Sequence, residues 1–250
     1  MSLSKSNFLK VIIVILILAT LTTLAVFYFK QKSGGGDDKL INEVTGLKDS
    51  NNEIVAKAEE VGLRELRRID DTDYVWGEAS APVQVIVYSD FLSPFSLQFS
   101  DTLKQVKQEF PGKVKIAFRH YSLGMFPDEI QTANASECAG EQGKFWEMVD
   151  ALFANNKVNN LNQEQYQKDA QALNLDAVKF TECLQSAKYQ SKIEAQIKEG
   201  KSFGVNGVPT VFVNNKILPG AYPFADFTDS SGAKQLGLKS LISMELGTGN

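Results

Sequence analysis

The hydrophobic pattern begins with one long apolar run near the start of the chain. Residues 11–29 contain no charged side chain. A helix of this length, rising about 1.5 Å per residue, roughly matches the ~30 Å hydrocarbon core of a bilayer. A signal peptide usually has a shorter apolar stretch, and this run ends in the bulky residues Val26–Phe29. The pattern favours an uncleaved membrane anchor, with a weak cleavage site at Thr23-Leu24-Ala25 as the alternative.

A linker and a second helical pattern follow this run. Residues 33–38 are rich in Gly and Asp, which is typical of a flexible linker. Between residues 52 and 69, apolar residues recur at helical spacing and predict a helix next to the membrane. We therefore expect a cytoplasmic tip and transmembrane anchor over 1–32, a linker and juxtamembrane helix over 33–73, and a globular domain over 74–250.

The globular domain alternates short apolar runs with stretches of helical spacing. Runs rich in Val and Ile have the pattern of buried strands, and Pro94 has the position of a helix start. The predicted elements are strands over 83–88, 114–118, 210–213 and 216–218, and helices from Pro94 to about Phe110, over about 127–203 and over 233–245. Asn214-Asn215 predicts a hairpin turn between the last two strands. This order predicts an α/β fold in which a helical insertion interrupts one sheet.

Composition and charge narrow the possible functions. Apolar residues make up 43% of the 250 residues and charged residues 22%, as is usual for a chain that buries a core. The formal net charge of -4 argues against a nucleic-acid binder, which needs a basic surface to neutralise phosphate. The spacing of His120, Cys138 and Cys183 matches no closed zinc site. We therefore expect no metal and no cofactor.

Five segments, in the right order, resemble the DsbA-like branch of the thioredoxin superfamily. They are Ala81-Pro82-Val83, residues 88–96 (YSDFLSPFS), residues 138–147 (CAGEQGKFWE), residues 183–186 (CLQS) and Gly207-Val208-Pro209-Thr210. The resemblance covers about residues 74–245 and implies a thioredoxin-like fold with a helical insertion. The chemistry of that family is thiol–disulfide exchange by a C-x-x-C pair at a helix N-terminus, where the helix dipole stabilises a thiolate.

Serines occupy the two positions that the resemblance assigns to the catalytic cysteines. These are Ser93 and Ser96, with Pro94 and Phe95 between them. A hydroxyl group cannot form a disulfide, so this pair cannot carry out dithiol exchange. Either the serines are natural, in a redox-inactive branch, or they are engineered replacements of cysteines. Val87 stands where redox-active relatives often carry a buried acid, and its presence favours natural loss.

The resemblance also implies a peptide-binding site. It aligns Pro209 with the cis-proline of the family, which leaves the backbone groups of Val208 facing the 93–96 segment. An extended peptide could pair with these groups as an added strand. We therefore expect Pro94, Phe95, Val208 and Pro209 to bind extended or unfolded polypeptide without redox turnover. The alternatives are an active thiol–disulfide oxidoreductase, if the serines are engineered, and a scaffold for a dedicated membrane redox or assembly partner.

Cys138 and Cys183 are the only cysteines. The resemblance suggests a structural disulfide between them, with two buried thiols or a second redox pair as the alternatives. A disulfide requires an oxidising compartment. We therefore expect the N-terminus inside the cytoplasmic membrane and the domain outside it, because the lysines that flank the apolar run give almost no bias.

Two further polar residues lie close to the serines in the sequence. His120, the only histidine, is predicted to be a solvated or packed strand-end residue. A hydrolase in which His120 is the base for Ser93 is a minor alternative, because the chain lacks a G-x-S-x-G motif and no carboxylate is identifiable as an orienting partner. Asp90 is predicted to cap the helix near Pro94 or to point to solvent, with a catalytic role as the minor reading.

Overall fold

The computed structural model describes residues 66–247. The predicted membrane anchor over 11–29 and the linker over 33–38 lie outside these residues. Within the described part, no helix combines the length and the apolar character needed to cross a membrane. The predicted helix over 52–69 lies mostly outside as well, and its last residues, 66–69, have no helical structure. The compact unit begins at Leu66, before the predicted domain start near Tyr74.

A five-stranded sheet forms the centre of this unit. Its strands are β1 (Val75–Trp76), β2 (Val83–Ser89), β3 (Val114–His120), β4 (Thr210–Val213) and β5 (Lys216–Pro219), in the order β1-β3-β2-β4-β5. β2 and β3 are parallel, and the other pairs are antiparallel. The four predicted strands are confirmed. β1 was not predicted, because a strand of two residues is too short to show an alternating hydrophobic pattern.

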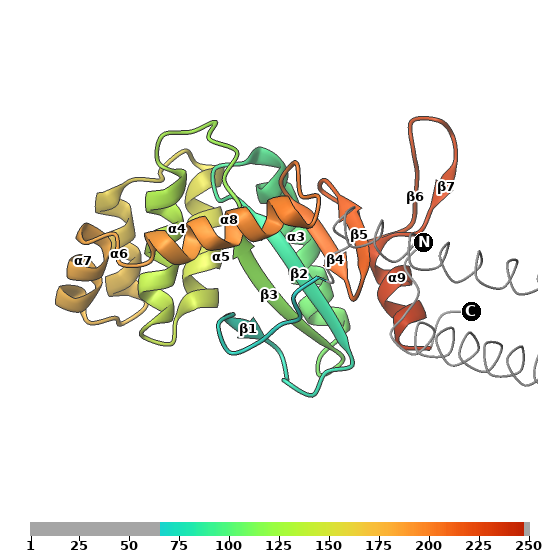
Figure 1. The fold of residues 1–250 in the computed structure, drawn as a ribbon, viewed down its shortest axis with the longest axis horizontal. Helices are drawn as coiled ribbons and strands as arrows, with labels where there is room; N and C mark the ends of the chain where they lie inside the picture. The colour runs from blue at the N-terminus through green and yellow to red at the C-terminus, as the bar shows by residue number, and fades with distance from the viewer. Residues whose placement is uncertain (1–65, 248–250) are drawn as a thin grey trace, which may run out of the picture. The chain divides into compact units, whose positions relative to one another are not determined.

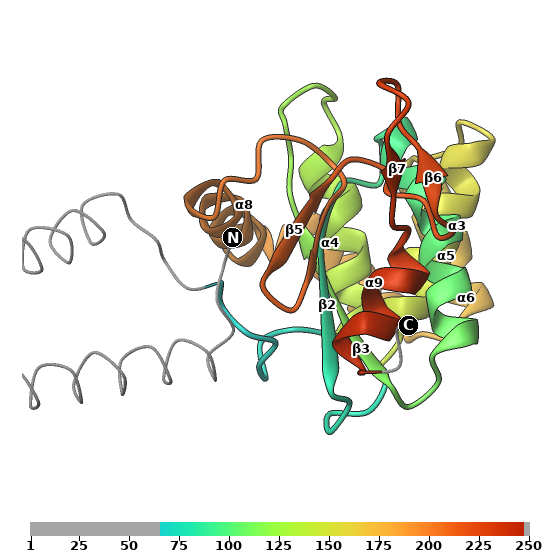
Figure 2. The same ribbon diagram turned by 90° about the vertical axis from the view of Figure 1, so that its right-hand side faces the viewer.

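Helices cover both faces of the sheet. Helices α3 (Pro94–Glu109) and α9 (Leu238–Glu245) lie on one face, and α8 (Gln190–Ser202) lies on the other (Figure 2). Successive residues of β2 point to opposite faces, so Val85 packs in the cluster under α3 and α9, whereas Ile86 packs in the cluster under α8. All seven residues of β2 are buried, as expected of a strand covered on both sides.

The predicted helical insertion is confirmed. It consists of α4 (Glu129–Gly140), α5 (Phe145–Lys157), α6 (Gln163–Ala172), α7 (Ala177–Gln185) and α8, of which α4 to α7 gather beside the sheet (Figure 1). These four helices enclose a second apolar cluster, which also contains Phe91 and Phe118 from the sheet side. The Cys138–Cys183 disulfide, with 5.8 Å between the Cα atoms, joins α4 to α7 inside this cluster and confirms the expected pairing.

The C-terminal helix is shorter than predicted. It begins at Leu238, and the preceding β7 (Lys234–Gln235) pairs with β6 (Phe227–Thr228) in a separate hairpin (Figure 1). The carboxylate of Asp229 accepts hydrogen bonds from the backbone N–H groups of Ser231 and Ala233 and closes the hairpin turn. The prediction that this helix starts at residue 233 was therefore wrong. The hydrogen bonds between the Asp229 carboxylate and the backbone favour a hairpin here, and the apolar spacing of so short a segment is too weak to form a helix instead.

Candidate functional site

Three connecting segments meet at one edge of the sheet. β2 and β3 run parallel and end together, with Ser89 opposite His120. β4 is antiparallel to β2 and begins at the same edge, with Thr210 opposite Tyr88. Residues 90–93 after β2, residues 121–128 after β3, and residues 207–209 before β4 therefore lie at a common edge (Figure 1).

Ser93 and Ser96 lie in the turn that starts α3. Ser93 is the N-cap residue, and its Oγ accepts a hydrogen bond of 3.3 Å from the backbone N–H of Ser96. Pro94 occupies the first turn of the helix, as the sequence predicts. Both serine side chains are buried, and the backbone N–H of Ser93 donates to the carbonyl of Asp90. The Ser93 hydroxyl thus satisfies a free N–H group of the helix end.

Asp90 does not cap α3 and does not face solvent, which corrects both expectations for this residue. Its side chain is 6% exposed, and its Oδ1 accepts a hydrogen bond of 2.9 Å from the backbone N–H of Leu92. Its own backbone N–H donates to the Oγ of Ser96 at 3.4 Å. Burial raises the pKa of Asp90 to about 7, with a further increase from the nearby carboxyl of Glu129. Ser93 takes the capping position instead because it directly precedes Pro94.

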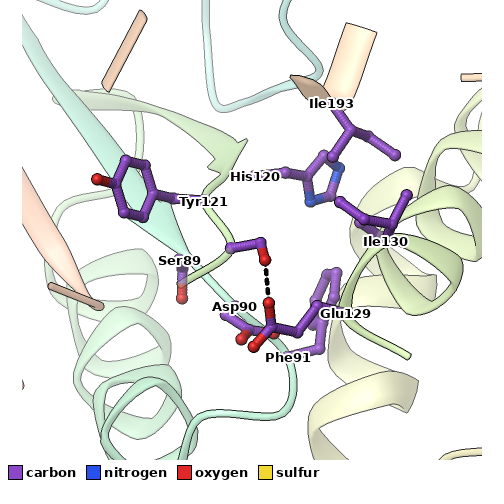
Figure 3. Close-up of a pocket in the computed structure, with 10 residues that line it drawn as sticks. Ser89, Asp90, Phe91, His120, Tyr121, Glu129, Ile130 and Ile193 are labelled. Carbon is purple, nitrogen blue, oxygen red and sulfur yellow. Dashed lines mark hydrogen bonds between the residues drawn. The ribbon is translucent and has the colours of Figure 1, made fainter. Parts of the chain in front are cut away.

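Glu129, at the start of α4, holds the segment after β3 in place. Its carboxylate accepts a hydrogen bond from the hydroxyl of Ser122, marked by the dashed line at Glu129 in Figure 3. It also accepts from the backbone N–H groups of Gly124, Met125 and Phe126. Burial alone would raise the pKa of Glu129, but these donors bring it below its usual range. Glu129 was not among the residues predicted for the site, although Pro127-Asp128-Glu129 has the composition of a helix start.

His120 is buried at the end of β3, so it is a packed strand-end residue rather than a solvated one. Its Nε2 lies 3.1 Å from Oε1 of Glu137, whose Oε2 accepts a hydrogen bond of 2.7 Å from Nζ of Lys192. Burial favours the neutral form of Glu137, but His120 and Lys192 lower its pKa overall. The histidine thus has an orienting carboxylate that the sequence did not reveal. No hydrogen bond joins His120 to Ser93 in the part that the structure describes.

Apolar side chains are exposed at the same edge. Phe95, in the first turn of α3, is 62% exposed, and Met125 is 70% exposed. We call Phe95, Leu123, Met125 and Phe126 the edge surface; all four are exposed large hydrophobic residues. The exposed apolar side chains thus come from two elements of this edge, the first turn of α3 and the segment after β3.

The Val208–Pro209 peptide bond is cis, as the resemblance implies. The side chain of Val208 is buried in the cluster under α8. Across residues 66–247, its backbone N–H and C=O make no hydrogen bond. The chain therefore has unpaired backbone groups directly before β4, at the edge where α3 begins.

The two cysteines lie elsewhere, since their disulfide is enclosed by the insertion helices and is not part of the edge. Among the described side chains, no group of three or more His, Cys, Asp and Glu residues is arranged to hold a metal ion.

The chain matches a family model described as thioredoxin over residues 70–230. It is 32% identical over 162 residues to the Na(+)/H(+) antiporter NhaA 1 of Mycolicibacterium gilvum, covering 63% of this chain and 26% of the relative. It is 33% identical over 153 residues to the antiporter NhaA 3 of Salinispora tropica, covering 61% of this chain and 23% of the relative. The chain thus spans about a quarter of the length of these curated relatives.

Solved structures with a similar fold include two bacterial proteins. BdbD from Bacillus subtilis, in its oxidised form, has a TM-score of 0.57 at 22% identity, covering 70% of this chain and 93% of that one. Wolbachia pipientis alpha-DsbA1 has a TM-score of 0.57 at 21% identity, covering 73% and 95%. Together with the family match, these similarities show that the chain belongs to the thioredoxin family and has the fold of its DsbA-like branch.

Proposed function

We propose that this chain is a membrane-anchored, extracytoplasmic protein that binds extended or unfolded polypeptide at the sheet edge without redox turnover. The observation that carries the proposal is that serines, not cysteines, occupy the turn that starts α3. The fold of the redox-active branch is retained, but Ser93 is a helix cap and Ser96 is buried against Asp90. Neither residue offers a sulfur that could form a mixed disulfide with a partner.

The binding part of the proposal rests on what surrounds this turn. The edge surface offers apolar contacts for alternate side chains of an extended peptide. The unpaired backbone groups of Val208 offer hydrogen bonds to its main chain. Extended peptides often bind by adding a strand, with main-chain hydrogen bonds for affinity and side-chain pockets for specificity.

The location outside the cytoplasmic membrane is supported by two features. Residues 11–29 are an apolar run of the length of a membrane span. The Cys138–Cys183 disulfide fits an oxidising compartment, since disulfides are rare in the cytosol.

Binding of a labelled, unfolded, cysteine-free polypeptide to the full-length chain in lipid nanodiscs tests this proposal. Phe95→Ser and Met125→Ser should each weaken binding by about tenfold, as expected when an apolar contact of roughly 1–2 kcal/mol is removed. Val178→Ser is the matched control, because Val178 is 67% exposed but lies in the first turn of α7, in the insertion. Absence of binding, or equal losses in all three variants, would refute a peptide site at the edge.

The first alternative is an active thiol–disulfide oxidoreductase whose natural residues at positions 93 and 96 are cysteines. The observation that favours it is the retained fold, including the start of α3 at Pro94. The double variant Ser93→Cys/Ser96→Cys should then form a reducible pair and catalyse oxidative refolding of a reduced substrate. A double variant that forms the pair but remains inactive argues against this reading.

The second alternative is a scaffold for one membrane partner. It is favoured by the curated relatives, in which a segment similar to this chain makes up about a quarter of proteins named Na(+)/H(+) antiporters. Under this reading, a pull-down from solubilised membranes returns one partner in a fixed ratio. General peptide binding instead predicts a mixture of weakly bound chains.

A further inference from the structure

Two buried carboxyl groups from different elements meet beside the α3 turn. Asp90 precedes α3 and is 6% exposed, and Glu129 begins α4 and is 4% exposed. Both line a small pocket together with His120 and Ser122. Figure 3 shows the two carboxyl groups side by side, and the carboxyl of Glu129 adds to the increase that burial causes in the pKa of Asp90.

The two residues hold different parts of the edge. The backbone of Asp90 contacts both serines, since its C=O accepts from the N–H of Ser93 and its N–H donates to Oγ of Ser96. The carboxylate of Glu129 binds the segment 122–126, which includes three residues of the edge surface. The carboxyl pair therefore connects the α3 turn to the exposed segment after β3.

The distribution of hydrogen bonds indicates which group holds a proton. Two adjacent buried carboxylates cannot both be ionised without a large penalty, so such a pair retains one proton. Glu129 accepts hydrogen bonds from four donors, which favour its anionic form. The Asp90 side chain accepts only one, from Leu92, among the described residues. Asp90 is thus the member that is protonated and can donate to Glu129.

We propose that Asp90 and Glu129 share one proton, and that its loss loosens segment 122–126 and makes polypeptide binding at the edge dependent on pH. The binding part rests on the proposed function, whereas the proton pair does not. With the proton present, Asp90 donates to Glu129 and the segment stays fixed. Without it, two like charges repel in a buried pocket, and the segment held by Glu129 is the exposed side that can move away.

The other ionisable groups around the pair are already engaged. His120, from β3, pairs with Glu137, which Lys192 of α8 also contacts. The hydroxyl of Tyr121 donates to the backbone carbonyl of Val205. Asp128, next to Glu129, is exposed to solvent. The remaining charged partner of Asp90 is thus Glu129 itself, and the raised pKa of Asp90, about 7, places the change near neutral pH.

Nuclear magnetic resonance of the isotope-labelled full-length chain in micelles tests the pair directly. The backbone amide signals of Gly124, Met125 and Phe126 should shift together between pH 5 and 9, with a midpoint near that of the Asp90 carboxyl carbon. In Asp90→Asn this shift should be lost, because the amide donates to Glu129 at every pH. Asp101→Asn, an exposed change on α3, should leave it intact.

Three outcomes overturn the shared proton. In the first, the amide signals do not move between pH 5 and 9. In the second, they still move in Asp90→Asn. In the third, the Asp90 carboxyl carbon of the unmodified chain titrates at its ordinary acidic pH. The last measurement needs no variant and therefore does not depend on whether Asp90→Asn folds. If the amide signals titrate but affinity for polypeptide is the same at pH 5.5 and 8.5, the link to binding fails. Absence of peptide binding at any pH instead refutes the proposed function but does not contradict the proton shared by Asp90 and Glu129.

Discussion

The guanidinium group of Arg119 donates two hydrogen bonds to the carboxylate of Asp73, from Nε at 3.0 Å and from Nη2 at 2.9 Å, and both side chains are fully buried. Arg119 lies in β3, and it also donates to the backbone carbonyls of Arg67 and Arg68 at 3.1 and 3.2 Å. The buried side chain of Arg119 thus connects the segment before β1 to β3, an interior strand of the sheet. Burial opposes the charge of Asp73, but Arg119 lowers its pKa overall.

Asp73→Asn should lower the free energy of unfolding by about 3 kcal/mol at pH 7, because it removes the buried carboxylate that accepts two hydrogen bonds from Arg119. The remaining charged partner of Arg119 among the described residues is Glu199, whose Oε1 lies 3.5 Å from Nη1. Urea unfolding followed by circular dichroism measures this change. The loss should shrink as the pH falls, since protonation of Asp73 in the unmodified chain removes the same interaction. Asp101→Asn is the control, because the Asp101–Lys104 pair is exposed and contributes at most about 1 kcal/mol. Equal effects of the two variants would show that Arg119 does not depend on Asp73.

Local pattern was sufficient for most of the fold. Strands such as β2 and the start of α3 at Pro94 follow from short-range signals, namely apolar runs and a proline in the first helical turn. The pair Asp73–Arg119 was not predictable, because the two residues are 46 positions apart. Nothing in the sequence near either residue indicates that both charges are buried.

The candidate site likewise contains residues that the sequence predicted and residues that only the structure revealed. The positions of Ser93, Ser96 and Pro209 came from the resemblance, and the structure places them at one edge of the sheet. Asp90 was misjudged because Asp and Ser are both good capping residues, and sequence spacing does not decide between them. Burial raises the pKa of Asp90, and the carboxyl of Glu129 adds to this increase. Both come from the fold, since Glu129 belongs to an element beyond β3.

Asp90→Asn should stabilise the chain at pH 8 and have little effect at pH 4. The folded-state pKa of Asp90 is raised to about 7, so the folded state binds its proton more tightly than the unfolded state. The stability that this proton contributes is complete below the unfolded-state pKa of about 4 and is lost as pH rises through about 7. The amide of Asn carries no charge and avoids that loss.

Thermal unfolding of the two proteins from pH 4 to pH 9 measures this difference. The unfolding midpoints of the two proteins should diverge above about pH 5. The corresponding difference in the free energy of unfolding at pH 8 should be roughly 1–3 kcal/mol, on the scale of 1.4 kcal/mol per pKa unit. Parallel curves would mean that Asp90 has an ordinary pKa in the folded protein. Asp101→Asn again serves as the control, since it removes an exposed carboxylate from the helix that follows Asp90.

Replacing both cysteines, as Cys138→Ala/Cys183→Ala, should lower the free energy of unfolding by about 2–4 kcal/mol. The disulfide closes a loop with a sequence separation of 45, and cross-linking such a loop restricts the unfolded chain. Urea unfolding with and without a reducing agent separates this effect from packing changes. The reducing agent should destabilise the unmodified chain and leave the double variant unaffected. A disulfide without structural importance predicts the same midpoint for the unmodified chain under both conditions.

Ser93→Ala should lower the free energy of unfolding by about 1 kcal/mol, because the Oγ of Ser93 is the side-chain acceptor for the first turn of α3. Ser93→Asn should recover most of this loss, since Asn is an equally good capping residue. Ser100→Ala is a matched control in the same helix, where the hydroxyl donates to the carbonyl of Leu97 and caps nothing. If Ser93→Asn is as unstable as Ser93→Ala, then Ser93 is retained for a contact other than the cap. The comparison therefore separates a serine that stabilises the helix from one that has another role at the edge.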